Sequence, residues 1–280
     1  MRRFDGYYAP WLEAQGPALC LLATIDDASG KVTRHGFAVS EGVIPVFTFW
    51  QGYLETHGKP KSLYLDGFST YQMNPGVARD NHELATQFQR AMQELNIEPI
   101  SAHSPQAKGR IERLFGTLQD RLIKELRLNN ITAIEEANHY LEREFIPEFN
   151  QKFAVQPRLP ANLHRPFSKE ELKQLPAILS HQEHRVVKND FTLSIDSQWY
   201  QLTEDQPALV RPKDRVIVEH RVDNTVHLRL RGKYLNYEVL PHRPKPATPK
   251  SWALTKTSQR AAYRPALNHP WRKFQYSSKN

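Results

Sequence analysis

Three acidic residues, far apart in the first part of this 280-residue chain, could together do chemistry. Asp5 lies in the opening segment RRFDGYY, Asp66 ends the apolar segment KSLYLD, and Glu112 follows the turn SPQAKG. Three carboxylates in one cleft would repel each other unless cations lay between them, and such oxygen ligands suit Mg²⁺ or Mn²⁺. Two such ions could activate a water or a sugar hydroxyl and stabilise the leaving oxygen of an in-line phosphoryl transfer.

Each acid also has a simpler structural explanation. An aspartate before glycine, as at Asp66, is commonly a turn residue, and Asp5 alone would be a solvent-facing strand residue. Glu112 alone would be a partner for the basic residues around it on a helix surface. Asp26 and Asp27 are rivals for the first acid, but their hairpin turn should lie away from the carboxyl end of the strand that holds Asp66. Only a shared location would make these acids a site.

Hydrophobic patterning predicts the elements that would bring the three acids together. Three antiparallel strands are expected within residues 1–8 and 18–40, and alternating helices and strands should follow at 42–57, 61–67, 83–96 and 97–103. In such a sheet the first and fourth strands can lie side by side and parallel. The expected fold class is therefore α/β, with a mixed five-stranded sheet and flanking helices.

Two further helices are expected after the fifth strand. The first should open after Pro105 and run to about Leu128, with Glu112 off its apolar stripe. The second should cover 133–153, with Thr132 as its N-cap and Glu135 at capping-box spacing. The first of these helices would pack against the strands that hold the two aspartates.

The second half of the chain has a different sequence pattern. Residues 155–176 are rich in proline and resemble a linker with one short helix. About five short alternating strands between 183 and 240 suggest a small all-β barrel. The expected domains are a core at 1–153, a linker at 154–180, a barrel at 181–241 and a basic tail at 242–280.

Charge and cysteine content narrow the class of protein. The formal net charge is +8, and residues 241–280 hold nine Lys or Arg and no Asp or Glu. A basic tail with interspersed aromatic residues is typical of an arm that lies on a phosphate backbone, although a solubilising disordered end is the alternative. The single cysteine, Cys20, lies in an apolar run and is expected in the core. The apolar runs are too short for a membrane span, so a cytoplasmic location is expected.

Several motifs resemble one known family. SPQAKGRIERLFGTLQDRLIKELRL (104–128) resembles the stretch around the catalytic glutamate of bacterial insertion-sequence transposases with a retroviral-integrase-type, ribonuclease-H-like catalytic core. FDGYYAPWLEAQGPALCLLATIDDASGKV (4–32) and LYLDG (63–67) resemble their two aspartate-bearing segments. KFAVQPRLPANLHRP (152–166) is similar to a further stretch of the family. The resemblance covers nearly the whole chain and is nearest to the ISNCY group.

The resemblance implies a catalytic triad of Asp5, Asp66 and Glu112 that binds two divalent metal ions, Mg²⁺ or Mn²⁺. Such enzymes hydrolyse DNA at the ends of a mobile element and join the freed 3′-hydroxyl to target DNA. The basic residues around the glutamate would then hold the phosphodiester near the metals, or else pair with the glutamate or solvate the helix: Lys108, Arg110 and Arg113. Gly109 would let the backbone approach a ligand, and Gly116 would keep the face beside Glu112 open.

The chain also departs from the family pattern. Family members usually carry helix-turn-helix segments upstream of the core, whereas only four residues precede Asp5 here. A fragment, a truncated copy or one part of a split reading frame is therefore expected, with little selective recognition of element ends. The short first strand is expected to weaken sheet pairing. The inserted stretch 71–83 is expected to form an extra surface loop.

Two hypotheses from different classes follow. The first is a metal-dependent DNA transposase core, which would bind double-stranded DNA and associate with further copies of itself on that DNA. The alternative is a DNA-binding protein without chemistry, which would use the barrel and the basic tail. Both place the protein in the bacterial cytoplasm with the nucleoid, and neither involves a membrane.

Overall fold

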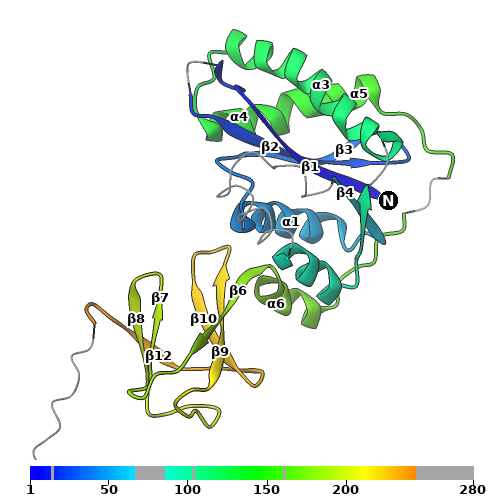
Figure 1. Cartoon of the computed structure of the whole chain (residues 1–280). Helices are drawn as coiled ribbons and strands as arrows, with labels where there is room; N and C mark the ends of the chain where they lie inside the picture. Colours follow the sequence, from blue (N-terminus) through cyan, green and yellow to red (C-terminus); the bar gives the residue numbers. More distant parts are fainter. Residues whose placement is uncertain (14–15, 67–85, 103–104, 160–161, 244–280) are drawn as a thin grey trace, which may run out of the picture.

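The computed structural model describes residues 1–13, 16–66, 86–102, 105–159 and 162–243, and the side chains of 66, 101–102 and 105–108 lie outside the described part. The first part of the chain forms one five-stranded sheet (Figure 1). Its strands and the helices between them are β1 (Arg2–Ala9), β2 (Leu19–Asp26), β3 (Val32–Ala38), α1 (Val43–His57), β4 (Ser62–Asp66), β5 (Glu98–Ala102) and α3 (Pro105–Leu128).

The sheet has the strand order β3-β2-β1-β4-β5. β1 pairs antiparallel with β2 and parallel with β4, and β4 pairs parallel with β5. This mixed α/β sheet with flanking helices confirms the predicted fold class. β1 pairs with β2 over its full length, from Arg2 to Ala9.

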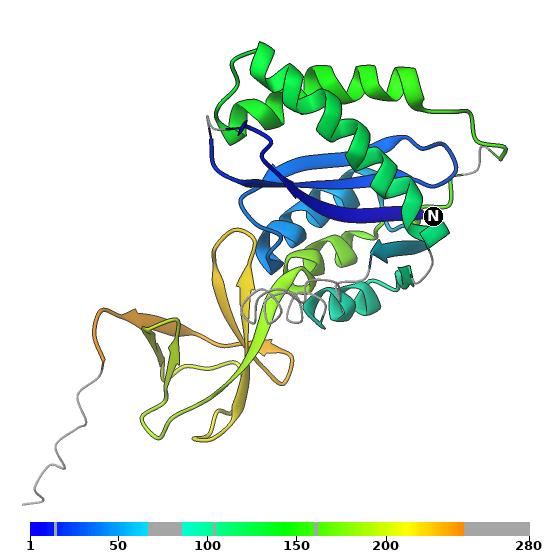
Figure 2. The same cartoon turned by 45° about the horizontal axis from the view of Figure 1, so that its top comes forward.

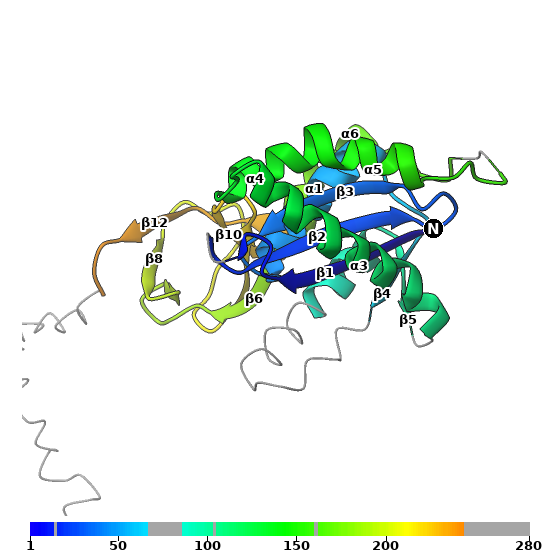
Figure 3. The ribbon, with the colours of Figure 1, turned by 90° about the horizontal axis from the view of Figure 1, so that it is seen from above.

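Helices cover both faces of this sheet. One face packs on α1 and on the helix that includes residues 86–94, through a cluster centred on aromatic side chains such as Phe4, Trp50 and Phe88. The other face packs on α3 and the helices that follow it, through Trp11, Phe115 and their neighbours. Seen from above, α3 crosses β1 obliquely, with one end near β4 and β5 (Figure 3). Cys20 is fully buried in the first cluster, as predicted.

The helical region after α3 differs in detail from the prediction. It consists of α4 (Ile134–Tyr140), a π-helical segment η2 (Leu141–Phe145) and α5 (Ile146–Phe153). The prediction that Thr132 is the N-cap is wrong. Ala133 occupies the cap position and makes no side-chain cap hydrogen bond. A capping box does form at a later helix, α6 (Lys169–Ile178), where Ser168 and Glu171 satisfy each other's backbone N–H groups.

Two asparagines of this helical region bond to the edge strand β3. The Asn150 side chain accepts a hydrogen bond from the Val32 N–H (2.8 Å) and donates to the Val32 carbonyl (2.9 Å). Asn138 does the same at Phe37, at 2.6 and 3.2 Å. Each amide therefore stands in for a neighbouring strand and covers an edge that would otherwise offer unpaired backbone groups.

The five-stranded sheet and the helices packed on it are called the first unit below. Replacing Asn150 by alanine should destabilise this unit by about 1–3 kcal/mol, because two partly buried backbone groups of Val32 lose their partners. Urea unfolding followed by tryptophan fluorescence would measure this change. Asn150→Asp keeps the acceptor and loses the donor, so its free energy of unfolding should lie between those of the wild type and the alanine variant. An alanine variant as stable as the wild type would show that the amide has no role at the edge.

The segment after α5 is attached to the first unit. Leu175 and Leu179, in α6 and at its end, belong to the apolar cluster of α1 and β4. Lys59 pairs with Glu171, and Arg90 donates to the carbonyls of Ile178 (3.0 Å) and Ser180 (2.7 Å). α6 is the short helix expected in the Pro-rich segment, and it lies against the first unit (Figure 1).

The last part of the described chain is all β. Its strands are β6 (Ser180–Val186), β7 (Thr192–Ile195), β8 (Gln198–Leu202), β9 (Arg215–Arg221), β10 (Val226–Leu230), β11 (Lys233–Tyr234) and β12 (Tyr237–Leu240). They form a sheet of order β11-β10-β9-β6 and a second sheet of order β12-β8-β7, which share one apolar core. Figure 2 shows this unit beside the first one. Where a small barrel was expected, the described strands pair as two antiparallel sheets.

Some predicted features lie outside the described residues, namely the surface loop at 71–83 and nearly all of the basic tail. Among the helices that the structure does describe, none is long and apolar enough to cross a membrane.

Candidate active site

The register of the central strands brings the first two candidate acids to neighbouring positions. Arg2, Arg3 and Phe4 of β1 pair with Leu63, Tyr64 and Leu65 of β4. The next residue on each strand is Asp5 and Asp66 respectively, and neighbouring strands lie about 4.8 Å apart. The two positions therefore meet at one place in the sheet, although the side chain of Asp66 lies outside the described part.

Alternation along β1 shows which face Asp5 occupies. The Phe4 ring lies 5.4 Å from the rings of Phe49 and Trp50, on the α1 side of the sheet. The Tyr7 ring stacks at 5.3 Å on Phe115 of α3, on the other side. Because side chains two apart on a strand share a face, Asp5 lies on the α3 face with Tyr7.

Glu112 lies on the part of α3 that faces β1. Phe115 stacks on Tyr7, and the Tyr7 hydroxyl donates to Oε1 of Gln119 at 3.3 Å. Glu112, Phe115 and Gln119 follow one line along the helix, because residues three and seven apart share a face. Glu112 is exposed, off the buried stripe of α3, as predicted.

Two contacts bracket Asp5 and Glu112. At one end Phe115 meets Tyr7, and at the other end Arg110 lies 3.5 Å from a carboxylate oxygen of Asp27, which is paired with Arg3. Asp5 lies between Arg3 and Tyr7 on β1, and Glu112 lies between Arg110 and Phe115 on α3. The two acids are thus carried by the same stretch of the β1–α3 contact.

The surroundings of Asp5 are partly shielded from water. Its carboxylate accepts a hydrogen bond from the Gly6 N–H at 2.9 Å, and the residue is half-buried. On the opposite face of β1, Glu41 lies over Gly6, and burial raises the pKa of the Glu41 carboxyl to about 7. Burial also raises the pKa of the Cys20 thiol, and the charges of Glu41 and Asp5 add to that shift. The thiol is therefore an inert core group.

The basic residues around Glu112 have separate positions. The Arg110 guanidinium donates to the backbone carbonyl of Asp27 and lies near its carboxylate. Arg113 is exposed, and its Nε donates to the Gly109 carbonyl one turn earlier, at 2.7 Å. The side chain of Lys108 lies outside the described part. The described contacts of the two arginines thus involve Asp27 and the helix backbone.

The two glycines of α3 leave open space around them. A Cβ atom added at Gly109 or at Gly116 would meet nothing within 4 Å. Packing therefore does not require glycine at either position. Gly116, one turn after Glu112, is exposed and leaves the helix surface beside Glu112 without a side chain.

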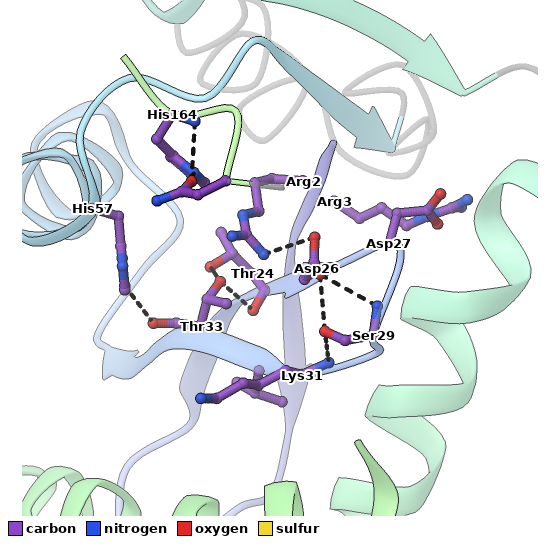
Figure 4. Close-up of polar contacts among 12 residues, drawn as sticks. Arg2, Arg3, Thr24, Asp26, Asp27, Ser29, Lys31, Thr33, His57 and His164 are labelled. Atoms are coloured by element: carbon purple, nitrogen blue, oxygen red, sulfur yellow. Dashed lines mark hydrogen bonds and ion pairs between the residues drawn. The ribbon is translucent and has the colours of Figure 1, made fainter. Parts of the chain in front are cut away.

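The rival acids lie beside the amino end of β1, away from the carboxyl end of β4, as the sequence indicated. Asp26 pairs with Arg2 at 2.9 Å and accepts a hydrogen bond from the Ser29 hydroxyl, and Asp27 pairs with Arg3 at 2.7 Å (Figure 4). Arg2 is opposite Asp26 in the sheet register. Sequence reasoning considered Asp27 only as a rival acid and missed its link to α3, which depends on how the hairpin meets a helix more than 80 residues away.

Among the side chains that the structure describes, no group of three His, Cys, Asp or Glu is arranged to hold a metal ion. The set predicted from the sequence includes Asp66, whose side chain lies outside the described part. Asp5 and Glu112 offer carboxylate oxygens, which are the ligands that Mg²⁺ and Mn²⁺ prefer.

No protein-family model matches the chain. Among solved structures, the HTLV-2 integrase catalytic core domain in complex with magnesium, in its dimeric form, aligns with a TM-score of 0.40 and 17% identity, over 59% of this chain and 94% of that one.

Two curated proteins match by sequence. A protein from Sinorhizobium fredii that is named as a transposase is 36% identical over 85% of this chain and 51% of its own length. The transposase for an insertion sequence of Streptococcus pneumoniae is 31% identical over 89% of this chain and 53% of its own length. The chain thus spans about half the length of these relatives. Over most of its own length, the chain is therefore similar in sequence to about half of each of two proteins named as transposases.

Proposed function

We propose that this chain holds the catalytic centre of a DNA transposase, with Asp5, Asp66 and Glu112 as metal ligands. The observation that carries this proposal is the convergence of the three backbone positions: Asp5 and Asp66 at neighbouring sites on β1 and β4, and Glu112 on the helix that packs on β1. The transposase relatives give the reaction class.

The donor set fits Mg²⁺ or Mn²⁺. Strand alternation predicts that Asp66 shares the face of Tyr64, which is the face of Asp5. Three carboxylates from three elements would then meet in a cleft open to solvent on the side of Glu112. When bound, two divalent ions would activate the attacking water or 3′-hydroxyl and stabilise the leaving oxygen of the phosphodiester.

The protein's own residues would orient these ligands and the DNA. The Gly6 N–H donates to one Asp5 oxygen, which fixes the direction of that carboxylate. Arg113, exposed and next to Glu112, would contact phosphates without reading bases, and Lys108 would do the same. The open face at Gly116 would leave room for the DNA backbone beside Glu112.

Double-stranded DNA is the proposed partner, at the element ends and at the target. Holding two DNA ends together requires more than one active site, so association with further copies of the chain on DNA is part of the proposal. The basic stretch at 244–280, with its interspersed aromatic residues, would add affinity for the phosphate backbone, and this affinity would fall steeply with salt.

Nicking of supercoiled plasmid DNA tests this function without knowledge of the element ends. The purified chain should nick the plasmid in Mn²⁺ and, more slowly, in Mg²⁺. It should be inactive in EDTA, because the carboxylates alone cannot stabilise the leaving oxygen. Asp120→Asn, which changes an exposed acid on the outer side of α3, should be as active as the wild type. Metal-independent nicking, or DNA binding without nicking, would contradict the proposal, and the latter would favour the binding-only alternative.

A further inference from the structure

We propose that Asp27 is a positioning residue, whose carboxylate ties the strand that holds Asp5 to the helix that holds Glu112. This inference rests on the proposed function, because it assigns Asp27 a role relative to those two acids. In this role Asp27 touches neither metal nor DNA. It sets the distance between two elements that each contribute a ligand.

A single carboxylate oxygen lies between two guanidinium groups. The Arg3 Nε of β1 donates to Asp27 Oδ1 at 2.7 Å, and Nη1 of Arg110 in α3 lies 3.5 Å from the same oxygen. Arg110 also donates to the backbone carbonyl of Asp27. The hairpin after β2 therefore connects β1 to the first turns of α3 through one residue.

The two arginines have the same sequence spacing from the candidate acids. Arg3 is two residues before Asp5 and on the same face of the sheet, and Arg110 is two residues before Glu112. A shift of Arg110 relative to Arg3 would consequently shift Glu112 relative to Asp5 by a similar amount, because strand and helix are rigid over two residues.

The strand β4, which carries Asp66, also contacts Arg3. The Arg3 guanidinium lies 5.3 Å from the centre of the Tyr64 ring of β4, and Tyr64 is two residues before Asp66. Arg3 thus contacts both the strand that carries Asp66 and, through Asp27, the helix that carries Glu112. One layer of contacts lies immediately before each of the three acids.

Burial gives this link its strength. The side chain of Arg3 is only 10% exposed and that of Asp27 is 25% exposed, whereas Arg110 is 50% exposed. Salt screens a partly buried pair much less than a surface pair. Tyr7 is the other point of contact between β1 and α3, through its stacking on Phe115 and its hydrogen bond to Gln119. Without the Asp27 carboxylate, the first turns of α3 would keep the apolar packing of Ile111 and Leu114 but lose their ion pair with the hairpin.

A simple electrostatic role predicts the opposite result for the same substitution. If Arg110 acted only by attracting DNA, removing the Asp27 charge would free it and raise both DNA affinity and nicking. In the positioning role, Asp27→Ala keeps or raises DNA affinity but lowers the maximal nicking rate about tenfold to a hundredfold, as expected for a small misplacement of reacting groups. The two roles therefore predict changes of opposite sign in the nicking rate of Asp27→Ala.

The experiment compares Asp27→Ala, Asp27→Asn and Arg110→Ala with Asp26→Ala, a neighbouring hairpin acid that pairs with Arg2 instead. Backbone amide hydrogen exchange over residues 109–115 should become about tenfold faster in both Asp27 variants and in Arg110→Ala. In Asp26→Ala the exchange rate over the same residues should stay unchanged. The double variant of Asp27 and Arg110 should nick DNA no more slowly than the worse single variant, because each change alone already breaks the ion pair between the Asp27 carboxylate and Arg110.

The outcomes separate the two levels of inference. Faster hydrogen exchange over residues 109–115 in the variants supports the positioning role of Asp27. If the wild-type chain also fails to nick DNA, that result contradicts only the proposed function. Unchanged exchange in both Asp27 variants, or additive losses of nicking rate in the double variant, would overturn the role of Asp27 while the function stands. The asparagine variant keeps the shape of the side chain, so a fold lost only in the alanine variant leaves the test intact.

Discussion

Glu112→Gln should reduce Mn²⁺-dependent nicking by roughly a hundredfold to a thousandfold, the range seen when one group that stabilises transition-state charge is removed. The amide keeps the size of the side chain but is a poorer ligand for a hard divalent cation. Glu112 is exposed and lies off the buried stripe of α3, so its loss should leave the fold intact. Initial rates of plasmid nicking at saturating Mn²⁺ would measure the effect.

DNA binding provides the control for this prediction. The substitution removes a negative charge, so DNA affinity in a metal-free filter-binding assay should be unchanged or slightly higher. Thermal unfolding should also match that of the wild type. A variant that retains full nicking activity would show that Glu112 is not a metal ligand, and the assignment of α3 to the active site would be wrong.

The second large effect is expected far from this site, at Glu219. Its side chain is fully buried in the all-β unit, where it accepts from Arg229 at 2.6 Å, from Arg221 at 3.1 Å and from the Tyr234 hydroxyl at 3.2 Å. Glu219→Ala leaves two partly buried guanidinium groups without their carboxylate. Breaking such a pair should destabilise the unit by about 3–5 kcal/mol. Urea unfolding monitored by far-ultraviolet circular dichroism would measure this change.

Glu238 gives a matched comparison, because it is a glutamate in a strand of the same unit but is exposed. Glu238→Ala should change the free energy of unfolding by no more than about 0.5 kcal/mol. Equal stabilities of the two alanine variants would mean that the buried network of Glu219 contributes nothing to the all-β unit.

Much of the first unit was predictable because its signals are local. The buried run of β2, the amphipathic pattern of α3 and the turn at 26–30 each reflect a periodicity that neighbouring residues impose. The placement of Asp5 beside Asp66 then follows from parallel pairing of the first and fourth strands. The structure has this pairing, and it also puts Asp26 at the amino end of β1, as expected.

Other features depend on contacts that no local pattern encodes. Thr132 has the residue type and spacing of an N-cap, yet Ala133 takes the position, since packing of α4 on β3 sets where the helix begins. The bonds from Asn150 to Val32 and the link from Asp27 to Arg110 join residues more than 80 positions apart. For Arg110 the sequence suggested a DNA contact, a pairing with Glu112 or a solvated helix surface, and no local pattern pointed to Asp27, its partner in the structure.

The most direct test of the central claim is to locate the metal ions. Crystals of the chain grown with Mn²⁺ and a short DNA duplex should give two anomalous peaks about 3.5–4 Å apart, each roughly 2.0–2.3 Å from carboxylate oxygens of Asp5, Asp66 or Glu112. Mn²⁺ bound elsewhere, with these three carboxylates turned away from one another, would contradict the account.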